Sequence, residues 1–257
     1  MFSMGFIDIN CDLGEGSNEI DCAQDKQLMP YISSCNIACG GHAGNQLTMN
    51  NSVENAVTNN LKIGAHPSYP DRINFGRNSI KIALPDLKSS LKTQINQLQS
   101  ILLEQDKRLH HIKFHGALYN DVESNPELAI ELGSFCYEHY PQIKLMGLAN
   151  GALASFCNDK NIPFIAEGFM DRRYRSDGQL VSRKELSAVI PQINQVIEQA
   201  LALASNKPIQ TIEKLPLSIK IDSLCLHGDH PEALSIIKKL KQELDNFNIQ
   251  LCKNTDY

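Results

Sequence analysis

Residues 36–44 read NIACGGHAG, an apolar run that passes through a cysteine and two glycines to a histidine. The run predicts a short strand over residues 36–39, and the glycines after it allow a tight turn and the close approach of other groups. His42 would then stand at the carboxyl end of a strand, where a histidine can hydrogen-bond, bind a metal or transfer a proton near neutral pH. A structural and a functional role both fit this stretch alone, so the ends of the other strands decide its interpretation.

Other short apolar runs also predict strands, and amphipathic segments with apolar residues at helical spacing separate most of them. The predicted strands cover residues 6–10, 36–39, 62–66, 111–115, 143–148, 163–168 and 223–227. The predicted helices cover residues 46–60, 85–106, 125–140, 192–205 and 231–246. Because strands and helices alternate over nearly the whole length, the pattern indicates an α/β fold with parallel strands.

Polar residues recur where these strands end, and they distinguish a barrel from an open sheet. They are Asn10 with Asp12, His42, His66, His115, Glu167 with Asp171 and Arg172, and His227 with Asp229. A barrel gathers the carboxyl ends of its strands around one mouth, where the active sites of such barrels lie, whereas an open sheet spreads them along an edge. We therefore predict a seven-stranded parallel (β/α) barrel. Since no linker or change in composition divides the chain, we expect a single domain over residues 1–257.

Composition argues against several classes of partner. The chain has 257 residues, of which 42% are hydrophobic and 21% charged, a balance typical of a globular protein with a substantial core. The net charge of −5 argues against nucleic acid and against an anionic membrane surface. No apolar run approaches the roughly 18 residues of a membrane span, and no signal peptide is recognisable, so a cytoplasmic protein is expected. The eight cysteines are scattered, as expected of buried reduced thiols.

The histidines and the carboxylate at the predicted mouth suggest a site of acid–base or metal chemistry. The candidate catalytic residues are Asp12, His42, His66 and His115. Histidine nitrogens together with a carboxylate are typical ligands of zinc and similar divalent ions. For each of these histidines, a buried structural residue is the alternative interpretation.

Two polar loops offer arginines for an anionic substrate. Residues 67–77 read PSYPDRINFGR, and residues 170–183 read MDRRYRSDGQLVSR. A guanidinium group binds a carboxylate or phosphate in bidentate fashion. The candidate substrate-binding residues are therefore Arg72, Arg77, Arg172, Asp171 and His227, with solvated loops and internal ion pairs as the alternative. The sequence contains no P-loop, no GxGxxG after the first strand and no GxSxG motif.

Several long motifs in this chain resemble those of one protein family. They are DINCDLGEG (8–16), SCNIACGGHAG (34–44), GAHPSYPDRINFGR (64–77), KFHGALYN (113–120), MDRRYRSDGQLVSR (170–183) and CLHGD (225–229). In these blocks, which stand in family order and cover almost the full chain, the sequence resembles the LamB/YcsF family. It differs at Gly41, where the family usually has a phenylalanine, and at Phe114, where it usually has a proline. Glycine at position 41 is expected to widen the mouth or loosen its loop.

The resemblance implies a fold and an activity. It implies a barrel of the glycoside hydrolase/deacetylase type, acting as the A subunit of an ATP-dependent 5-oxoprolinase. That enzyme opens the lactam 5-oxo-L-proline to L-glutamate together with subunits B and C, with ATP as a co-substrate of the complex. By similarity to related barrel deacetylases, Asp12, His66 and His115 would hold a divalent metal. A stand-alone metal-dependent amidohydrolase or sugar deacetylase is one alternative, and a non-catalytic lactam-binding protein of the complex is another.

Overall fold

The structure, a computed structural model, describes residues 5–16, 18, 22–183, 185–228 and 232–253. Asp229, and the first residue of the helix predicted over 231–246, lie outside these residues. The strands of the main sheet are β1 (Gly5–Leu13), β2 (Ser34–Ala38), β3 (Lys62–His66), β4 (His111–Lys113), β5 (Lys144–Leu148), β6 (Phe164–Phe169), β9 (Ser223–Leu226) and β10 (Ile249–Leu251). The helices are α1 (Ala23–Leu28), α2 (Gln46–Thr58), α3 (Leu84–Glu104), α4 (Gly116–Ser124), α5 (Pro126–His139), α6 (Ala152–Lys160), α7 (Ile193–Ala204) and α8 (Ala233–Asn246), with a short 3-10 turn at Met29–Tyr31.

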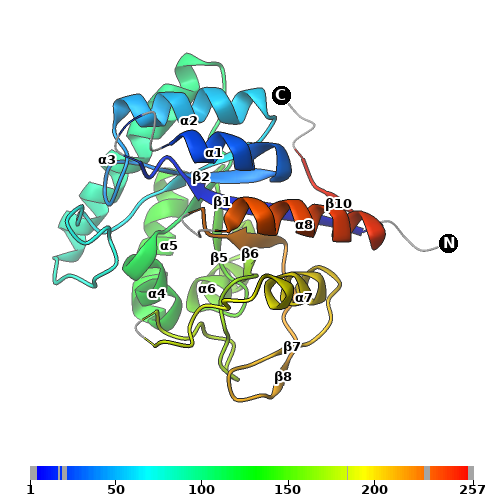
Figure 1. Cartoon of the computed structure of the whole chain (residues 1–257). Helices are drawn as coiled ribbons and strands as arrows, with labels where there is room; N and C mark the ends of the chain where they lie inside the picture. Colours follow the sequence, from blue (N-terminus) through cyan, green and yellow to red (C-terminus); the bar gives the residue numbers. More distant parts are fainter. Residues whose placement is uncertain (1–4, 17, 19–21, 184, 229–231, 254–257) are drawn as a thin grey trace.

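The sheet closes into a barrel (Figure 1). Strands β1 to β6 lie side by side in chain order, and β9 pairs with both β6 and β1. Every pair around this ring is parallel. The predicted seven-stranded parallel (β/α) barrel is therefore confirmed, and the carboxyl ends of its strands meet at one mouth.

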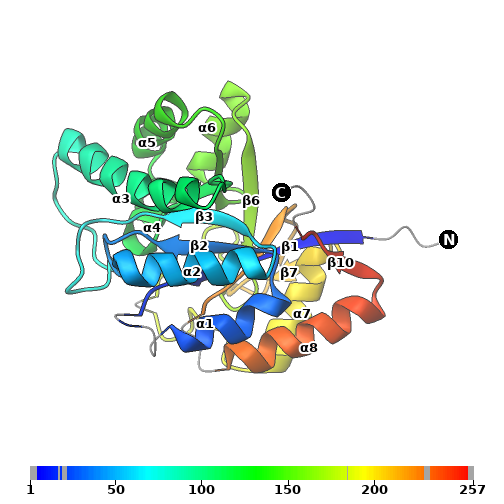
Figure 2. The same ribbon diagram turned by 90° about the horizontal axis from the view of Figure 1, so that it is seen from above.

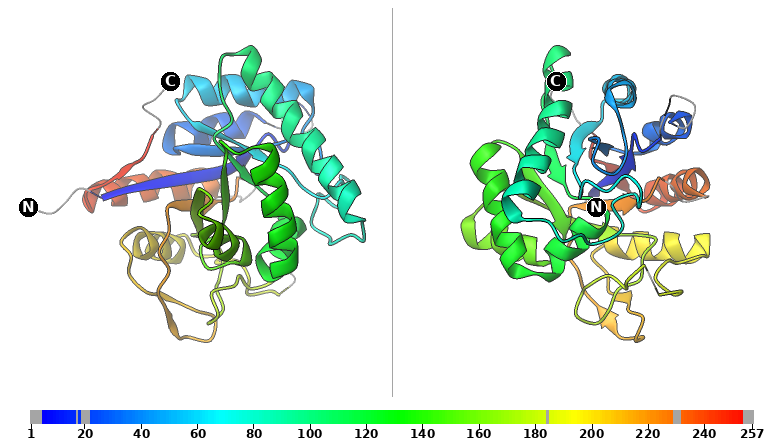
Figure 3. Two further views of the ribbon diagram at one scale, coloured as in Figure 1. Left: turned by 180° about the vertical axis from the view of Figure 1, so that it is seen from behind. Right: turned by 90° about the vertical axis from the view of Figure 1, so that its left-hand side faces the viewer.

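The helices form a layer around the strands, as Figure 3 shows, and α2 lies along β2 (Figure 2). Helix α3 illustrates why these segments are helical: proline stands in its first turn, where a helix tolerates it. Its residues Leu87, Leu91, Ile95, Leu98 and Leu102 recur at a spacing of three or four and are buried against the barrel. No helix in the described part of the chain is both long and apolar enough to span a membrane.

Some elements are additional to the prediction. Strand β10 pairs with the first residues of β1, at the outer end of that strand. Strands β7 (Ile209–Gln210) and β8 (Pro216–Leu217) form a small antiparallel pair of their own. Helices α1, α4 and α6 are six to nine residues long. Segments this short show too few turns or alternations for a pattern to reveal them.

The interior of the barrel is polar because the strands alternate polar and apolar residues. From Asp8 onward, β1 sends every second side chain inward, while Ile9 and Leu13 are buried on the side of the helices. Inside, Asp8 accepts hydrogen bonds from Ser34 and Ser223, which belong to the strands on either side. The apolar core therefore lies between strands and helices, and a hydrogen-bonded polar column runs through the barrel to its mouth.

Candidate active site

A cavity of about 450 Å³ opens at the carboxyl ends of the strands. This size is typical of a site for a small molecule. Six of the predicted site residues line it, namely Asp12, His66, Arg77, His115, Arg172 and His227. Three others are not part of its lining, namely His42, Arg72 and Asp171. Most of the candidate residues therefore lie at the same mouth. Six of them face the cavity, and the other three do not contribute to its lining.

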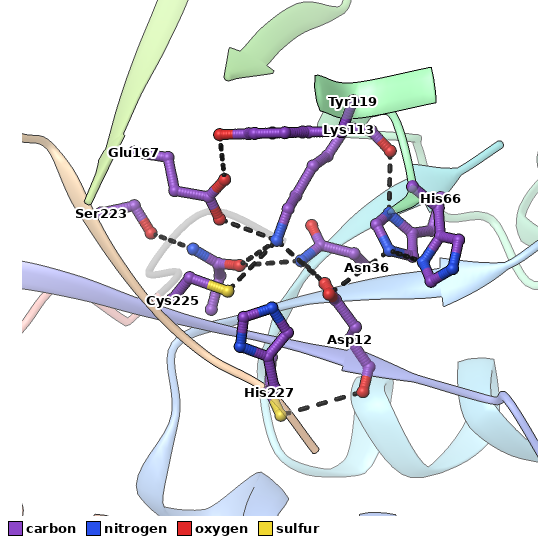
Figure 4. Close-up of polar contacts among 12 residues, drawn as sticks. Asp12, Asn36, His66, Lys113, Tyr119, Glu167, Ser223, Cys225 and His227 are labelled. Carbon is purple, nitrogen blue, oxygen red and sulfur yellow. Dashed lines mark hydrogen bonds and ion pairs between the residues drawn. The ribbon is translucent and has the colours of Figure 1, made fainter. Parts of the chain in front are cut away.

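Asp12 ends the polar column and is held by groups from three other strands or strand ends (Figure 4). Its Oδ1 accepts hydrogen bonds from Asn36 Nδ2 at 2.7 Å and from Lys113 Nζ at 3.0 Å. Its Oδ2 faces His66 Nε2 at 3.4 Å. Burial alone would raise the pKa of Asp12, but the neighbouring His66 ring and the Lys113 ammonium outweigh it and hold this pKa well below the usual range. Asp12 is therefore an oriented, ionised carboxylate at the floor of the cavity.

Lys113 is a buried cation between two carboxylates. Its Nζ lies 3.0 Å from Asp12 Oδ1 and 2.7 Å from Glu167 Oε1, and its side chain is 2% exposed. The other oxygen of Glu167 accepts a hydrogen bond from the Tyr119 hydroxyl at 2.9 Å. Burial would lower the pKa of Lys113, but the charges of Asp12, Cys225 and Glu167 raise it well above the usual value. Lys113 therefore stays charged and compensates the carboxylates around it.

The His66 and His115 rings each turn one nitrogen toward the other ring. His66 Nδ1 donates to the Lys113 carbonyl at 2.8 Å, and His115 Nε2 donates to the Phe75 carbonyl at 3.0 Å, since a carbonyl oxygen can only accept. The remaining nitrogens, His66 Nε2 and His115 Nδ1, lie 3.0 Å apart. In neutral rings both carry lone pairs, so this contact requires a cation, either a shared proton or a metal ion.

A divalent metal ion fits this set of donors. Asp12, His66 and His115 each offer one ligand atom, and these three atoms lie within 4.8 Å of one another. A metal-binding histidine typically donates its other ring N–H to a carboxylate or a backbone carbonyl. Both rings do so here, through the carbonyls of Lys113 and Phe75. The tautomers of the two histidines are thus the ones that metal coordination needs.

His42 lies directly behind His115. The two rings stack with centroids 3.6 Å apart and an angle of 5° between their planes. His42 Nε2 lies 3.1 Å from Glu15 Oε1, within hydrogen-bond distance. Burial above all, together with the proximity of His66, lowers the pKa of His42 to about 2. His42 is therefore a neutral, fully enclosed ring that holds Glu15.

His227 and Asp171 form a second pair on another side of the mouth. His227 lines the cavity, and its Nδ1 donates to Asp171 Oδ2 at 2.8 Å. Burial alone would raise the pKa of Asp171, but His227 outweighs it and lowers this pKa. An ionised carboxylate that binds one ring nitrogen fixes the tautomer and leaves the other nitrogen for the substrate. This arrangement suits a histidine that transfers a proton to or from a substrate.

The arginines divide between the cavity and the scaffold. Arg172 is buried, and its Nη2 donates to the Val181 carbonyl at 2.6 Å, while its Nε has no hydrogen-bond partner among the described residues. Arg77 and Arg183 also line the cavity. Arg72, predicted to bind substrate, instead donates through Nη1 to the carbonyls of Gly40 and Gly44 in the loop after β2. Arg172 is therefore the arginine best placed to bind a carboxylate in the cavity. Arg72 instead links the loop after β3 to the loop after β2.

Gly41 does not open the mouth, contrary to the expectation from sequence. A Cβ atom at Gly41 would lie 2.3 Å from Gln94 Oε1 and 2.5 Å from Ser68 Oγ. Gln94 also accepts a hydrogen bond from the Ser68 amide and donates one to its carbonyl. The space that a side chain at position 41 would need is thus filled by Gln94, which also holds the loop in place.

Comparisons with known proteins identify the family. A profile of the LamB/YcsF family matches residues 7–256. The chain belongs to the LamB/YcsF family. It is 35% identical to the A subunit of 5-oxoprolinase from Bacillus cereus (strain Q1) over 250 residues, which is 97% of this chain and 99% of that protein.

Two solved structures share the fold of this LamB/YcsF protein. The lactam utilization protein from Thermus thermophilus matches with a TM-score of 0.88 and 25% identity, covering 96% of this chain and 98% of the other. The family 4 carbohydrate esterase from Streptomyces lividans matches with a TM-score of 0.50 and 9% identity, covering 98% and 92%. The predicted barrel type, that of glycoside hydrolases and deacetylases, is thereby confirmed.

Sequence reasoning missed several residues of this LamB/YcsF site. They are Glu15, Asn36, Lys113, Tyr119 and Arg183. The role of Glu167 as the ion-pair partner of Lys113 was also missed. A signal for two of them is present in the strands: in HIKFH (111–115) and in SCNIA (34–38), polar residues alternate with apolar ones. This alternation predicts that Lys113 and Asn36 point into the barrel, on the same side as His115 and Asp12. Glu15 and Arg183 lie in loops, where no such pattern exists.

Proposed function

We propose that this chain is the A subunit of an ATP-dependent 5-oxoprolinase, in which it binds 5-oxo-L-proline and contributes to its hydrolysis to L-glutamate. One observation carries the proposal: a single cavity combines the Asp12–His66–His115 cluster with the buried guanidinium of Arg172. 5-Oxoproline presents an amide carbonyl to be attacked and a carboxylate to be held, and the cavity offers a group for each. The relationship to the 5-oxoprolinase protein of Bacillus cereus supports the same substrate.

A divalent metal ion would be held by Asp12, His66 and His115. When bound, such an ion polarises a carbonyl and lowers the pKa of a bound water. The contribution of the chain is to orient these three ligands. Lys113 and Asn36 bind Oδ1 of Asp12 and leave Oδ2 directed toward the histidines.

His227 would move the proton that ring opening requires. Cleavage of the lactam C–N bond leaves a nitrogen that must gain a proton, and a positioned histidine can supply it. Asp171 binds His227 through Nδ1, so the proton would travel from Nε2. Arg172 would bind the substrate carboxylate in bidentate fashion and fix which side of the ring faces His227. Arg77 and Arg183, which line the same cavity, would add positive charge at that end.

ATP use would depend on partner subunits. Ring closure of glutamate is intramolecular, and well-oriented intramolecular reactions reach effective molarities of about 10⁵–10⁸ M. Hydrolysis of the ring therefore benefits from coupling to ATP, yet the sequence holds no P-loop. Subunits B and C would supply this coupling in a cytoplasmic complex, while this chain provides the pocket for the lactam.

The proposal is tested by purifying this chain with its B and C partners and measuring glutamate formed from 5-oxoproline. We expect ATP-dependent activity of the complex. His227→Gln, which keeps a polar side chain but cannot carry the proton, should lower kcat by about 10²–10⁴-fold. Glu54→Gln, on the exposed face of α2, is the matched control and should be fully active.

Other outcomes would assign the alternatives. Hydrolysis of an amide or of an acetylated sugar by the isolated chain, without ATP, would point to a stand-alone amidohydrolase or deacetylase. Full activity of the His227→Gln complex would reject His227 as the proton donor. Full activity of an Asp12→Asn complex as well, with 5-oxoproline still bound by this chain, would reduce the role of the chain to lactam binding.

A further inference from the structure

His111 reaches Asn36 across the strand that lies between them. Four residues are register partners on the consecutive strands β1 to β4, namely Asp12, Asn36, Gly64 and His111. Register partners of parallel strands point to the same face of a sheet, so these positions share the inside of the barrel. A Cβ atom at Gly64 would lie 2.2 Å from His111 Nε2. The glycine therefore leaves the space in which the His111 ring extends over β3 toward β2.

The contacts of Asn36 determine which way its amide group faces. Its Nδ2 donates to Asp12 Oδ1 at 2.7 Å and to Asn10 Oδ1 at 2.8 Å. Both of these oxygens also accept a hydrogen bond from the Lys113 ammonium, which can only donate. Because both neighbours are acceptors, Asn36 must present its NH2 group to them and turn its own oxygen the other way.

The oxygen of the Asn36 amide is bound by His111. His111 Nε2 lies 2.6 Å from Asn36 Oδ1 and donates to it, since an amide oxygen only accepts. Burial above all lowers the pKa of His111 well below its usual value, so the ring is neutral and its Nδ1 carries a lone pair. His110 Nδ1 lies 3.0 Å from that lone pair and donates to it. This second contact holds the ring in the tautomer that Asn36 requires.

His111 makes one orientation of the Asn36 amide favourable at both of its ends. A half-turn of the amide would exchange its oxygen and its NH2 group. The oxygen would then face the Asp12 carboxylate, and the NH2 group would face the N–H of His111. Asn36 and His111 are both fully buried, so water does not compensate for either mismatch.

We propose that His111 is a positioning residue for the reaction, which acts through Asn36 to hold Asp12, and that Gly64 provides the gap that this contact needs. The inference rests on the role proposed above for Asp12. Asn36 binds Oδ1 of Asp12 and leaves Oδ2 directed toward His66. His111, which does not line the cavity, therefore influences the direction of this carboxylate without contacting the substrate.

The test begins with the kinetics of the complex of this chain with its B and C partners. His111→Leu fills much of the same space but removes the donor. It should lower kcat for 5-oxoproline by about 10–100-fold, the range typical of partners that orient active-site groups. KM should change by less than about threefold, because Arg172, which would bind the substrate carboxylate, is unaltered.

Two other variants change the same contact by different means. Gly64→Ala keeps His111 but places a Cβ atom against its Nε2, and should lower kcat to a similar degree. His111→Gln offers an amide N–H in place of the ring N–H, and should be more active than His111→Leu. If His111→Leu does not fold, these two variants decide the outcome.

A double variant and a control make the kinetics specific. Asn36→Leu/His111→Leu should be no slower than Asn36→Leu, because His111 acts through Asn36. Leu98→Ala, on the buried face of α3, is the matched control. It weakens the core but should leave kcat unchanged once urea denaturation has given the folded fraction of each variant.

Nuclear magnetic resonance of the isolated chain gives a readout that does not depend on activity. The side-chain NH2 signal of Asn36 is assigned by its loss in Asn36→Leu. This signal should shift in His111→Leu and in Gly64→Ala, and it should stay in place in Leu98→Ala.

Each contrary result overturns a defined statement. Wild-type kcat in folded His111→Leu and Gly64→Ala would reject the positioning role, and so would an Asn36 signal that does not shift in them. Losses that multiply in the double variant would show that His111 does not act through Asn36. A wild-type complex that leaves 5-oxoproline intact would reject the proposed function, while the Asn36 signal would still decide whether His111 orients the amide.

Discussion

Lys113 determines how Asp12 is presented to the cavity. Its ammonium and the Asn36 amide both bind Oδ1, so Oδ2 is the oxygen that faces His66. The same ammonium lies against Glu167 on the other side. A buried ion pair often stabilises a fold no more than well-packed apolar residues of the same volume would. Removing one partner is nevertheless strongly destabilising, because the remaining charge is buried without compensation.

Replacing Lys113 with methionine should therefore destabilise the fold severely. The methionine side chain is close to that of lysine in length but is apolar. Packing is therefore largely kept, while Asp12 and Glu167 lose their counter-ion. We expect the free energy of unfolding to fall by about 3–5 kcal/mol, measured by urea denaturation.

Lys88→Met is the matched control for this change. Lys88 lies 2.7 Å from Glu131, and these side chains are 29% and 50% exposed. Solvent screens such a pair, so its loss should cost less than about 1 kcal/mol. Equal losses in the two variants would contradict the interpretation of Lys113 as a buried counter-ion.

Helix α4 joins the site to the strand–helix unit beyond it. It begins directly after His115, and it carries Tyr119, whose hydroxyl reaches Glu167. Near its end, Glu123 is buried and accepts a hydrogen bond from the Leu148 amide at 3.0 Å. Gly151, the N-cap of α6, gives it room, since a Cβ atom there would lie 1.7 Å from Glu123 Oε2. The helix that follows β4 is thus anchored by one enclosed carboxyl group.

Glu123 should make stability depend on pH. Burial raises its pKa from 4.5 to about 8, so the folded chain keeps a proton that the unfolded chain loses. The associated stability is fully present below about pH 4.5 and is lost as the pH rises through about 8. Glu123→Gln stays neutral, so from about pH 5 to about pH 8 its stability should decline less than that of wild type.

Urea denaturation at both pH values measures this difference. Glu131→Gln, which removes an exposed carboxylate from α5, should follow the pH dependence of wild type. Parallel curves for wild type and Glu123→Gln would show that Glu123 ionises in the folded chain as it does in the unfolded one.

The closed barrel places the candidate active site at the carboxyl ends of its strands. Because β9 pairs with β1, side chains from both ends of the sequence meet there, as His227 and Asp12 do. The cavity offers histidines, carboxylates and arginines for a small substrate, while the sequence has no P-loop for the phosphates of a nucleotide.

The isolated chain should therefore bind 5-oxoproline but not ATP with useful affinity. Isothermal titration should show no ATP binding tighter than about 1 mM, and no glutamate should form without the partner subunits. Micromolar binding of ATP to this chain alone would contradict the division of labour proposed between the subunits.

The architecture of this protein and much of the site could be predicted from its sequence. Strand–helix alternation and polar residues at strand ends predicted the barrel, and a barrel necessarily brings Asp12, His66 and His115 to one mouth. The DINCDLGEG and NIACGGHAG stretches also carried the family resemblance. These predictions succeed because they depend on short-range patterns in the sequence and on the topology of the barrel. The topology alone determines that the carboxyl ends of all strands meet at one mouth.

The direction in which individual side chains face emerged only from the folded chain. Lys113 and Asp12 are 101 residues apart, and their contact depends on strands that meet across the barrel. Arg72 turns to the carbonyls of Gly40 and Gly44 rather than to the cavity, and His42 turns to Glu15. His42 and Lys113 are buried, and a hydrogen-bond partner lowers the cost of burying such a polar group. Partners brought together by folding have no fixed spacing in the sequence.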